Sequence, residues 1–199
     1  QGSIQGEVAS LDADVTLFSD RLWLNEVKFE NFHLDVNAQD VPDEPQGDVK
    51  FQLVRDGQEL SLRSRFHLSD TAYQLNDLAL SGPGIKLAGQ VEGDFTQQTI
   101  TANLEGGSDD LSVLGDFLQE PMAGRFDIAA TLKPENKSQT ADVTLNAKNI
   151  ETRFGQVDAL HVQANLDSIF QQVQGHVETD IEQLSFNGYA IHSMDFALT

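Results

Sequence analysis

Hydrophobic and polar residues alternate along most of the chain, most regularly in the segment from Gly84 to Leu132. Between residues 85 and 95, apolar side chains and glycines take the odd positions, whereas lysine, glutamine and acidic residues take most even ones. The same alternation returns at residues 100–104 and 126–132. Because successive side chains of a strand point to opposite faces of its sheet, each segment predicts a β-strand with one apolar face.

One short helix is predicted between these strands. Asp109 and Asp110 stand where an N-cap residue is expected, and Leu111, Leu114 and Leu118 follow at helical spacing. We therefore expect a helix near residues 109–118. It is the only segment of the chain with a convincing helical pattern.

A β-hairpin is predicted at residues 49–68. The dipeptide Asp56-Gly57 is a strong hairpin turn signal, and alternating segments flank it on both sides. Residues 39–47, just before it, are rich in proline and acid and predict a surface loop. This loop is the best candidate boundary if the chain contains two units.

Two short patterns recur along the predicted strands. In Leu75-Leu78-Leu80 the apolar spacing slips by one residue, which is typical of a bulge or a bend. An apolar-x-Gly-x-apolar pattern appears at residues 87–91, 122–126 and 173–177. A glycine on the apolar parity leaves a gap in that face and allows the strand to bend, so we expect sheets that curl.

About a dozen one-sided strands with one short helix leave the apolar faces without helices to cover them. Two arrangements solve this problem. The strands pack as a closed sandwich of two sheets about 10 Å apart, or one long sheet curls into a trough whose apolar interior takes up a ligand. Periodicity alone leaves both arrangements open.

The charge balance excludes some classes of partner. The chain carries 32 acidic and 12 basic residues, a formal charge of −20, so direct electrostatic binding to nucleic acid or to an anionic membrane surface is disfavoured. A solvated acidic outer face that keeps the sheet soluble explains this charge. The chain has no cysteine, which excludes disulfides, thiol catalysis and cysteine metal sites.

No pattern of an enzyme or of a cofactor site is present in the sequence. There is no nucleophile elbow and no phosphate-binding loop. The histidines fall singly on predicted strands, without metal-ligand spacing, and are interpreted as solvated outer residues. They are His33, His67, His161, His176 and His192. We predict that the protein is not an enzyme and has no cofactor.

The central part of the sequence resembles the TamB family, whose members are AsmA-like proteins of the bacterial periplasm. The resemblance covers residues 73–166 and is carried by the phrases IKLAGQVEGDF, ITANLEGG, DDLSVLGDFLQEPMAGRFDIAATL and ADVTLNAKNIETRFGQVDALHVQANL. In that family, strands of the apolar-x-Gly-x-apolar type are interrupted by a small Asp-Leu-Ser-x-Leu helix. Asp110-Leu-Ser-Val-Leu114 matches this helix, and Gly124 matches the glycine of the strand that follows.

The resemblance implies a long curled antiparallel sheet that forms a taco-like hydrophobic groove. Residues 1–199 would be a single segment of this groove and part of a longer chain. The implied function is to shield acyl chains, to help transport phospholipid between the inner and outer membranes, and to assist outer-membrane protein assembly. The implied partners are phospholipid acyl chains and a TamA-type outer-membrane barrel-assembly protein. The implied location is the periplasmic portion of a protein anchored in the inner membrane by a segment outside these residues.

Under this resemblance the groove would be lined by apolar residues of the alternating strands. They are Val49, Phe51, Leu53, Leu60, Leu62, Phe66, Leu87, Val91, Ile100, Leu104, Phe126, Ile128, Val143, Leu145, Val162 and Leu166. The alternative hypothesis is an extracellular β-sandwich or adhesin-like module that binds other proteins through its loops.

Overall fold

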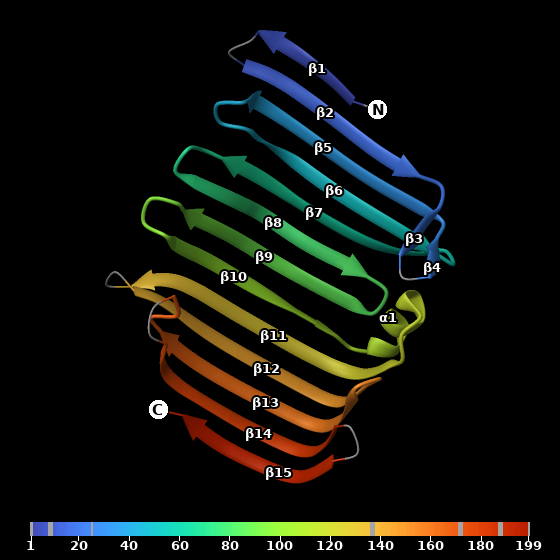
Figure 1. Ribbon diagram of the computed structural model, residues 1–199, viewed down its shortest axis with the longest axis vertical. Coiled ribbons are helices and arrows are strands. Elements are labelled where there is room, and N and C mark those ends of the chain that lie inside the picture. Colours follow the sequence, from blue (N-terminus) through green and yellow to red (C-terminus); the bar gives the residue numbers. More distant parts are fainter. Residues whose placement is uncertain are drawn as a thin grey trace. The chain divides into compact units, whose positions relative to one another are not determined.

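The computed structural model describes residues 2–7, 10–24, 26–135, 138–170, 173–186 and 189–198. The fold is all-β with one short helix, as the sequence predicted (Figure 1). Two compact units can be distinguished. Unit 1 comprises Gln1–Pro83 and Leu87–Gln98, and unit 2 comprises Gly84–Lys86 and Thr99–Thr199.

Unit 1 contains a sheet in which each main strand lies beside its neighbour in the chain. Its order is β1 (Gly2–Glu7), β2 (Ser10–Ser19), β5 (Asn31–Val41), β6 (Gln46–Arg55), β7 (Gln58–Leu68), β8 (Ala72–Gly82) and β9 (Ile85–Asp94). The strand pairs from β1 to β8 are antiparallel. Two short strands, β3 (Leu22–Leu24) and β4 (Val27–Phe29), form a separate hairpin between β2 and β5.

Unit 2 repeats this arrangement with longer strands. Its order is β10 (Thr99–Ser108), β11 (Met122–Glu135), β12 (Ser138–Thr152), β13 (Gly155–Asp167), β14 (Gln174–Phe186) and β15 (Tyr189–Leu198). All of these pairs are antiparallel. The helix α1 (Leu111–Leu118) connects β10 to β11 and packs against β11.

Each unit is built on a single layer of strands. In the part of the chain that the structure describes, only α1 and the β3–β4 hairpin lie outside the strand order of the two units. Neither unit closes its sheet, because among the described residues β1 does not pair with β9 in unit 1 and β10 does not pair with β15 in unit 2. A two-sheet sandwich is therefore wrong for either unit, and the open curled sheet is the arrangement observed.

The helix and its cap are as predicted. Asp110 is the N-cap residue, with extended backbone angles, and its Oδ1 accepts hydrogen bonds from the Ser112 amide at 2.9 Å and the Ser112 hydroxyl at 2.6 Å. Leu111 and Phe117 of α1 are buried. Capping an otherwise unpaired amide stabilises the first turn, so a helix of only eight residues forms between two strands.

The predicted hairpin is also present. Asp56 and Gly57, with φ angles of 50° and 75°, form the two-residue turn between β6 and β7. Positive φ at both positions matches the twist of antiparallel strands. The predicted loop at residues 39–47 is wrong in its extent, because β5 continues to Val41 and β6 begins at Gln46. The connection between these strands is therefore residues 42–45, which begin and end with a proline.

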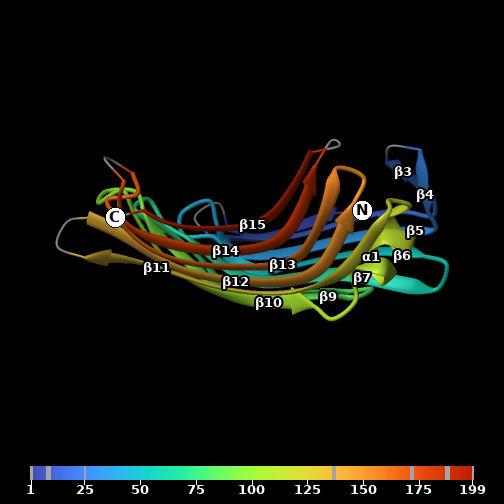
Figure 2. The same cartoon turned by 90° about the horizontal axis from the view of Figure 1, so that it is seen from below.

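Bulges and glycines bend the strands where the slipped pattern and the glycine motif predicted it. The register of β7 and β8 shifts between Arg63 and Arg65, opposite Asp77, which has a φ of 52°. Gly124 and Gly175 have φ angles of 102° and 146°, and a Cβ atom at either would collide with the backbone of a neighbouring strand, β12 or β13 respectively. The strands of each unit accordingly bow along their length (Figure 2).

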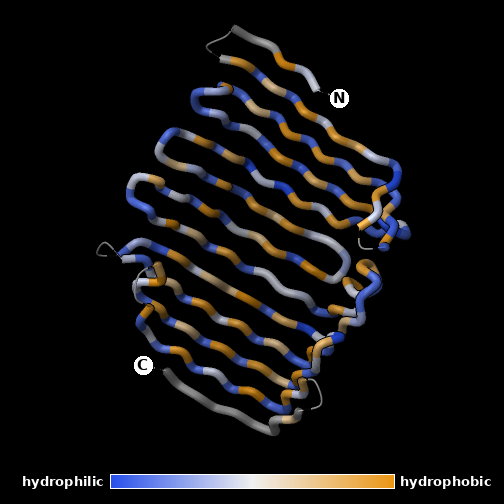
Figure 3. Tube along the Cα trace, in the orientation of Figure 1, coloured by the Kyte–Doolittle hydropathy of each residue, from blue (hydrophilic) through white to orange (hydrophobic). Residues whose placement is uncertain are grey.

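The two faces of each sheet differ in polarity. Hydrophobic and hydrophilic positions alternate along nearly every strand (Figure 3). The exposure of alanine shows how the two faces differ in packing, because its short side chain is shielded from water only where larger neighbours extend over it. Ala102 and Ala147 on the apolar face are 4% and 6% exposed, whereas Ala88 and Ala129 on the polar face are exposed. Larger neighbours therefore form a packed layer over the apolar face.

Candidate functional site

The apolar face of unit 1 brings together the groove residues predicted in β6 and β7. Phe51 is opposite Leu62, and Leu53 is opposite Leu60. Because register partners project to the same face, these side chains form continuous rows across the strands. The rows extend on both sides, since Leu34 of β5 is opposite Phe51 and Leu80 of β8 is opposite Leu62.

Four further predicted residues of unit 1 lie in the same sheet. Val49 is opposite Val36 of β5 and opposite Ser64 of β7, which interrupts the apolar row with a buried hydroxyl. Phe66 lies between Gly47 and Leu75 in register. The remaining two, Leu87 and Val91, lie on β9 and are half-buried.

In unit 2 the predicted groove residues form two rows across neighbouring strands. One row runs from Ile128 through Leu145 to Val162, and another runs from Leu104 through Ala130 to Val143. Phe126 is opposite Ala147, and Leu166 is opposite Ala141. Ile100 lies at the beginning of β10, outside these rows. In the second row and in these two pairs a large side chain lies beside an alanine, so neighbouring strands fit together within the layer.

Most of these residues keep part of their surface exposed. Among the predicted groove residues, Leu53 is buried at 4% exposed, whereas the others are half-buried. A residue in the core of a closed sandwich would be covered from the opposite sheet as well as from its neighbours. Within each unit the cover comes from neighbours in the same sheet, so the outer surface of this apolar layer stays accessible.

The β3–β4 hairpin covers one end of the apolar face in unit 1. Phe29, at the end of β4, is 2% exposed, and β4 contacts β6, whose Leu53 is buried. The amide of Glu30 donates to the carbonyl of Val54 at 2.8 Å and fixes the hairpin to β6. The hairpin also presents Trp23 and Leu24, which are exposed. The hairpin was not predicted, because strands of three residues are too short to show a period.

The polar face carries hydrogen-bonded pairs of side chains. The Thr16 hydroxyl donates to Asp35 at 2.9 Å, and His33 Nε2 lies 2.7 Å from the other carboxylate oxygen of Asp35. The hydrogen bond from Thr16, and then that with His33, lowers the pKa of Asp35. His161 and His176 each contact a polar neighbour on this face, at 2.7 Å and 2.9 Å. The side chain of His192 lies outside the described residues.

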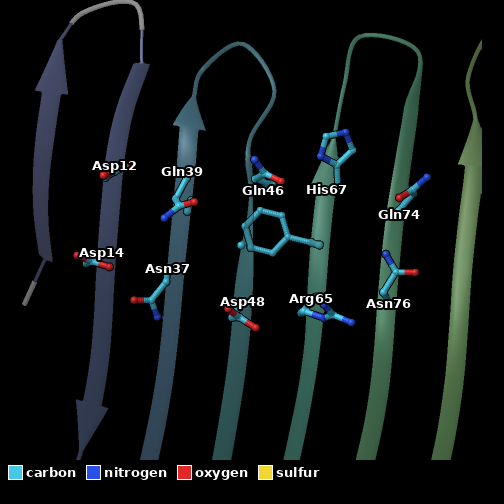
Figure 4. A pocket seen from close by; sticks show the side chains of 13 residues that line it. Asp12, Asp14, Asn37, Gln39, Gln46, Asp48, Arg65, His67, Gln74 and Asn76 are labelled. Atoms are coloured by element: carbon cyan, nitrogen blue, oxygen red, sulfur yellow. The ribbon is translucent and has the colours of Figure 1, made fainter.

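A hollow of about 720 Å³ lies on the polar face of unit 1, which sequence reasoning did not predict. We call it the polar hollow. It is lined from β2, β5, β6, β7 and β8 by residues within 12–14, 37–39, 46–48, 65–67 and 74–76. Figure 4 shows the lining side chains on neighbouring strands. Ten of its lining residues are polar and belong to the solvent-facing parity, so we assign the hollow to the polar face. Ala38, Gly47 and the predicted groove residue Phe66, which belong to the apolar parity, also line it.

Two other kinds of site are absent from the described part of the chain. No group of three or more histidine, aspartate or glutamate side chains there is arranged to hold a metal ion. Among the described residues, no helix combines the length and the apolar character needed to cross a bilayer. The accessible apolar layer and the polar hollow are therefore the two candidate functional surfaces of the described residues.

Comparison with protein-family models, with curated proteins and with solved structures gave no match. The resemblance to the TamB family thus stays a prediction from the motifs quoted above. Chemically, the apolar layer offers dispersion contacts and exclusion of water, without directional groups. A surface of this kind suits flexible hydrocarbon better than a ligand that is recognised by its polar groups.

Proposed function

We propose that this chain is a section of a β-groove protein that shields acyl chains and helps to move phospholipid between two membranes. The apolar faces of the sheets would contact the hydrocarbon, and the acidic faces would stay in water. The non-specific lining would let an acyl chain slide, because no single contact is strong.

One observation carries this proposal. The apolar layer of each unit is a single sheet face whose large residues, such as Phe51 and Leu145, are only half-buried. Leaving such a continuous apolar layer in water is unfavourable, and each methylene of a bound chain removed from water contributes about 0.8 kcal/mol. An acyl chain laid along the face therefore stabilises both the lipid and the protein.

The biological setting is proposed from the TamB resemblance. In this setting the chain lies in the periplasm, belongs to a protein anchored in the inner membrane, and works with a TamA-type partner in the outer membrane. The formal charge of −20 is compatible with this role, because the solvated faces keep a protein with one apolar face soluble.

Site-specific photocrosslinking tests the proposal with matched controls. A photoreactive amino acid is placed at Phe51 in unit 1 or at Leu145 in unit 2, and the protein is expressed in bacteria. The controls are Gln52 and Asn146, the next residue of each strand, which project to the polar face. Crosslinks to phospholipid at Phe51 and Leu145, and none at the controls, support the proposal.

The interaction-module hypothesis predicts a different result in the same experiment. If the apolar faces bind another protein, the probes at Phe51 and Leu145 crosslink to a polypeptide instead of a phospholipid. Equal lipid crosslinking on both faces would indicate non-specific capture and would also contradict the proposed function.

A further inference from the structure

The polar hollow of unit 1 is organised in two rows of side chains. Asp14, Asn37, Asp48, Arg65 and Asn76 are successive register partners across β2, β5, β6, β7 and β8. Register partners project to one face at close spacing, so these five polar groups form a line across the strands (Figure 4).

A second row runs parallel to the first. Gln39, Gln46, His67 and Gln74 are successive register partners, two residues along each strand from the first row. Both rows line the hollow of about 720 Å³. With a strand spacing of about 4.8 Å, the first row extends over roughly 19 Å, a length that suits an extended chain-like ligand lying across the strands.

Several of these side chains have unused hydrogen-bonding groups. No hydrogen bond joins the side chains of Asn37, Gln39 or Asn76 to another residue that the structure describes. Gln46 and Gln74, by contrast, donate to Asp40 and Glu92 beside the hollow. Each free amide offers both a donor and an acceptor. A hydroxyl group is also both donor and acceptor, so a ligand rich in hydroxyls matches the row.

The charge of the hollow restricts the ligand further. Asp12, Asp14 and Asp48 line it, and its one arginine, Arg65, is already paired with Asp77. Phosphates, nucleotides and other anions are therefore repelled. The lining side chains also form no metal-holding group in the described part of the chain. An uncharged ligand rich in hydroxyl groups avoids this repulsion, and its hydroxyls can donate to the aspartates as well as pair with the free amides.

We propose that the polar hollow binds an uncharged oligosaccharide, which lies across strands β2 to β8 and hydrogen-bonds to the amides of Asn37, Gln39 and Asn76. This site is on the face opposite the apolar layer. It therefore does not depend on the lipid function proposed above, and both faces can be occupied together.

Titration with three uncharged oligosaccharides tests this inference. The purified chain is titrated with cellohexaose, chitohexaose and maltohexaose, and binding is followed by calorimetry and by amide chemical shifts. We expect at least one of them to bind, with shift changes confined to β2, β5, β6, β7 and β8. A fully sulfated oligosaccharide, as the anionic comparison, is expected not to bind.

Two variants locate the site. Asn37→Ala with Asn76→Ala removes two free amides and is expected to weaken binding by about tenfold or more, because each lost hydrogen bond costs about 1 kcal/mol. Asn103→Ala, an exposed polar-face residue of unit 2, is the matched control and should leave binding unchanged. Amide shifts outside the hollow show that each variant is folded. Failure of all three sugars to bind, or equal binding by both variants, would overturn the inference.

Discussion

The rings of Phe32 and Phe51 meet edge to face across β5 and β6, with centroids 5.8 Å apart and planes at 69°. Both rings belong to the apolar face of unit 1, and both remain half-buried. An aromatic pair of this geometry contributes about 0.5–1.5 kcal/mol beyond the area it buries. The apolar layer is thus stabilised by contacts within one sheet, which allows its outer surface to stay accessible.

Phe29 is expected to fix the β3–β4 hairpin to the sheet. It is 2% exposed, so Phe29→Ala should lower the free energy of unfolding by about 3–5 kcal/mol, as truncation of a buried phenylalanine does. Urea denaturation measures this change. Phe18→Ala is the control, because Phe18 is 62% exposed and its loss should cost less than about 0.5 kcal/mol. Equal effects of the two changes would show that the hairpin does not pack as described.

We expect the side chain of Gln139 to take the place of a backbone hydrogen-bonding partner for Ile100. Its side chain accepts from the Ile100 amide at 2.8 Å and donates to the Ile100 carbonyl at 2.6 Å. Continuing the β10–β11 register from Ala102 and Leu132 places Pro134 opposite Ile100, and proline has no N–H to donate. Gln139 is 4% exposed. Gln139→Ala should therefore cost about 1–3 kcal/mol.

Hydrogen exchange checks this role of Gln139. The Ile100 amide should exchange faster in Gln139→Ala than in the original protein. Gln163→Ala, on the exposed face of β13, should leave both stability and exchange unchanged. Unaltered protection of the Ile100 amide in Gln139→Ala would contradict the assigned bond.

Asp110 is expected to make the stability of unit 2 depend on acid pH. The hydrogen bonds from the Ser112 hydroxyl and amide lower its pKa below the ordinary value of 3.8. A lowered folded-state pKa means that the stabilisation is complete above 3.8 and is lost as the pH falls through the lower folded-state value. Asp110→Asn keeps a capping side chain, so its free energy of unfolding should fall less at acid pH than that of the original protein. Asp110→Ala removes the cap and should be less stable at neutral pH.

Thermal melts across this pH range provide the measurement. Asp109→Asn changes the neighbouring carboxylate, which is not the cap, and serves as the control. An acid-side slope for Asp110→Asn equal to that of the original protein would show that the Asp110 carboxylate does not carry the effect.

Charged substitutions on the apolar face are expected to block lipid without preventing export. Leu104→Asp or Phe126→Arg places a charge in the apolar layer of unit 2, where hydrocarbon would have to pass. Lipid crosslinking from a probe at Leu145 should then fall strongly, while the amount of secreted protein is unchanged. Asn103→Asp, one residue along β10 on the polar face, is the control. Unchanged crosslinking in Leu104→Asp and Phe126→Arg would show that these residues do not line the groove.

The elements that were predicted correctly have local causes. Asp56-Gly57 forces a two-residue turn, Asp110 caps a helix one position later, and alternation fixes which face of each strand is apolar. The slipped spacing at Leu78 corresponds to the bulge beside Asp77. Each of these signals acts over a few residues, so the sequence contains it directly.

Apart from the short β3–β4 hairpin, the features that were missed depend on partners far apart in the chain. The bond between Gln139 and Ile100 joins residues 39 positions apart. The polar rows exist only because the register aligns Asn37 with Asp48 and Arg65 with Asn76, and the bulge beside Asp77 shifts that register. No local pattern encodes such an alignment, which explains why the polar hollow was not predicted.

The most direct test of the lipid proposal is to measure the phospholipid that co-purifies with the chain. The protein is purified from bacteria without detergent, extracted with organic solvent, and examined in parallel by native mass spectrometry. We predict bound phospholipid in the original protein and in Asn103→Asp, and its loss in Leu104→Asp. A lipid-free original protein, or equal lipid in Leu104→Asp, would contradict the account.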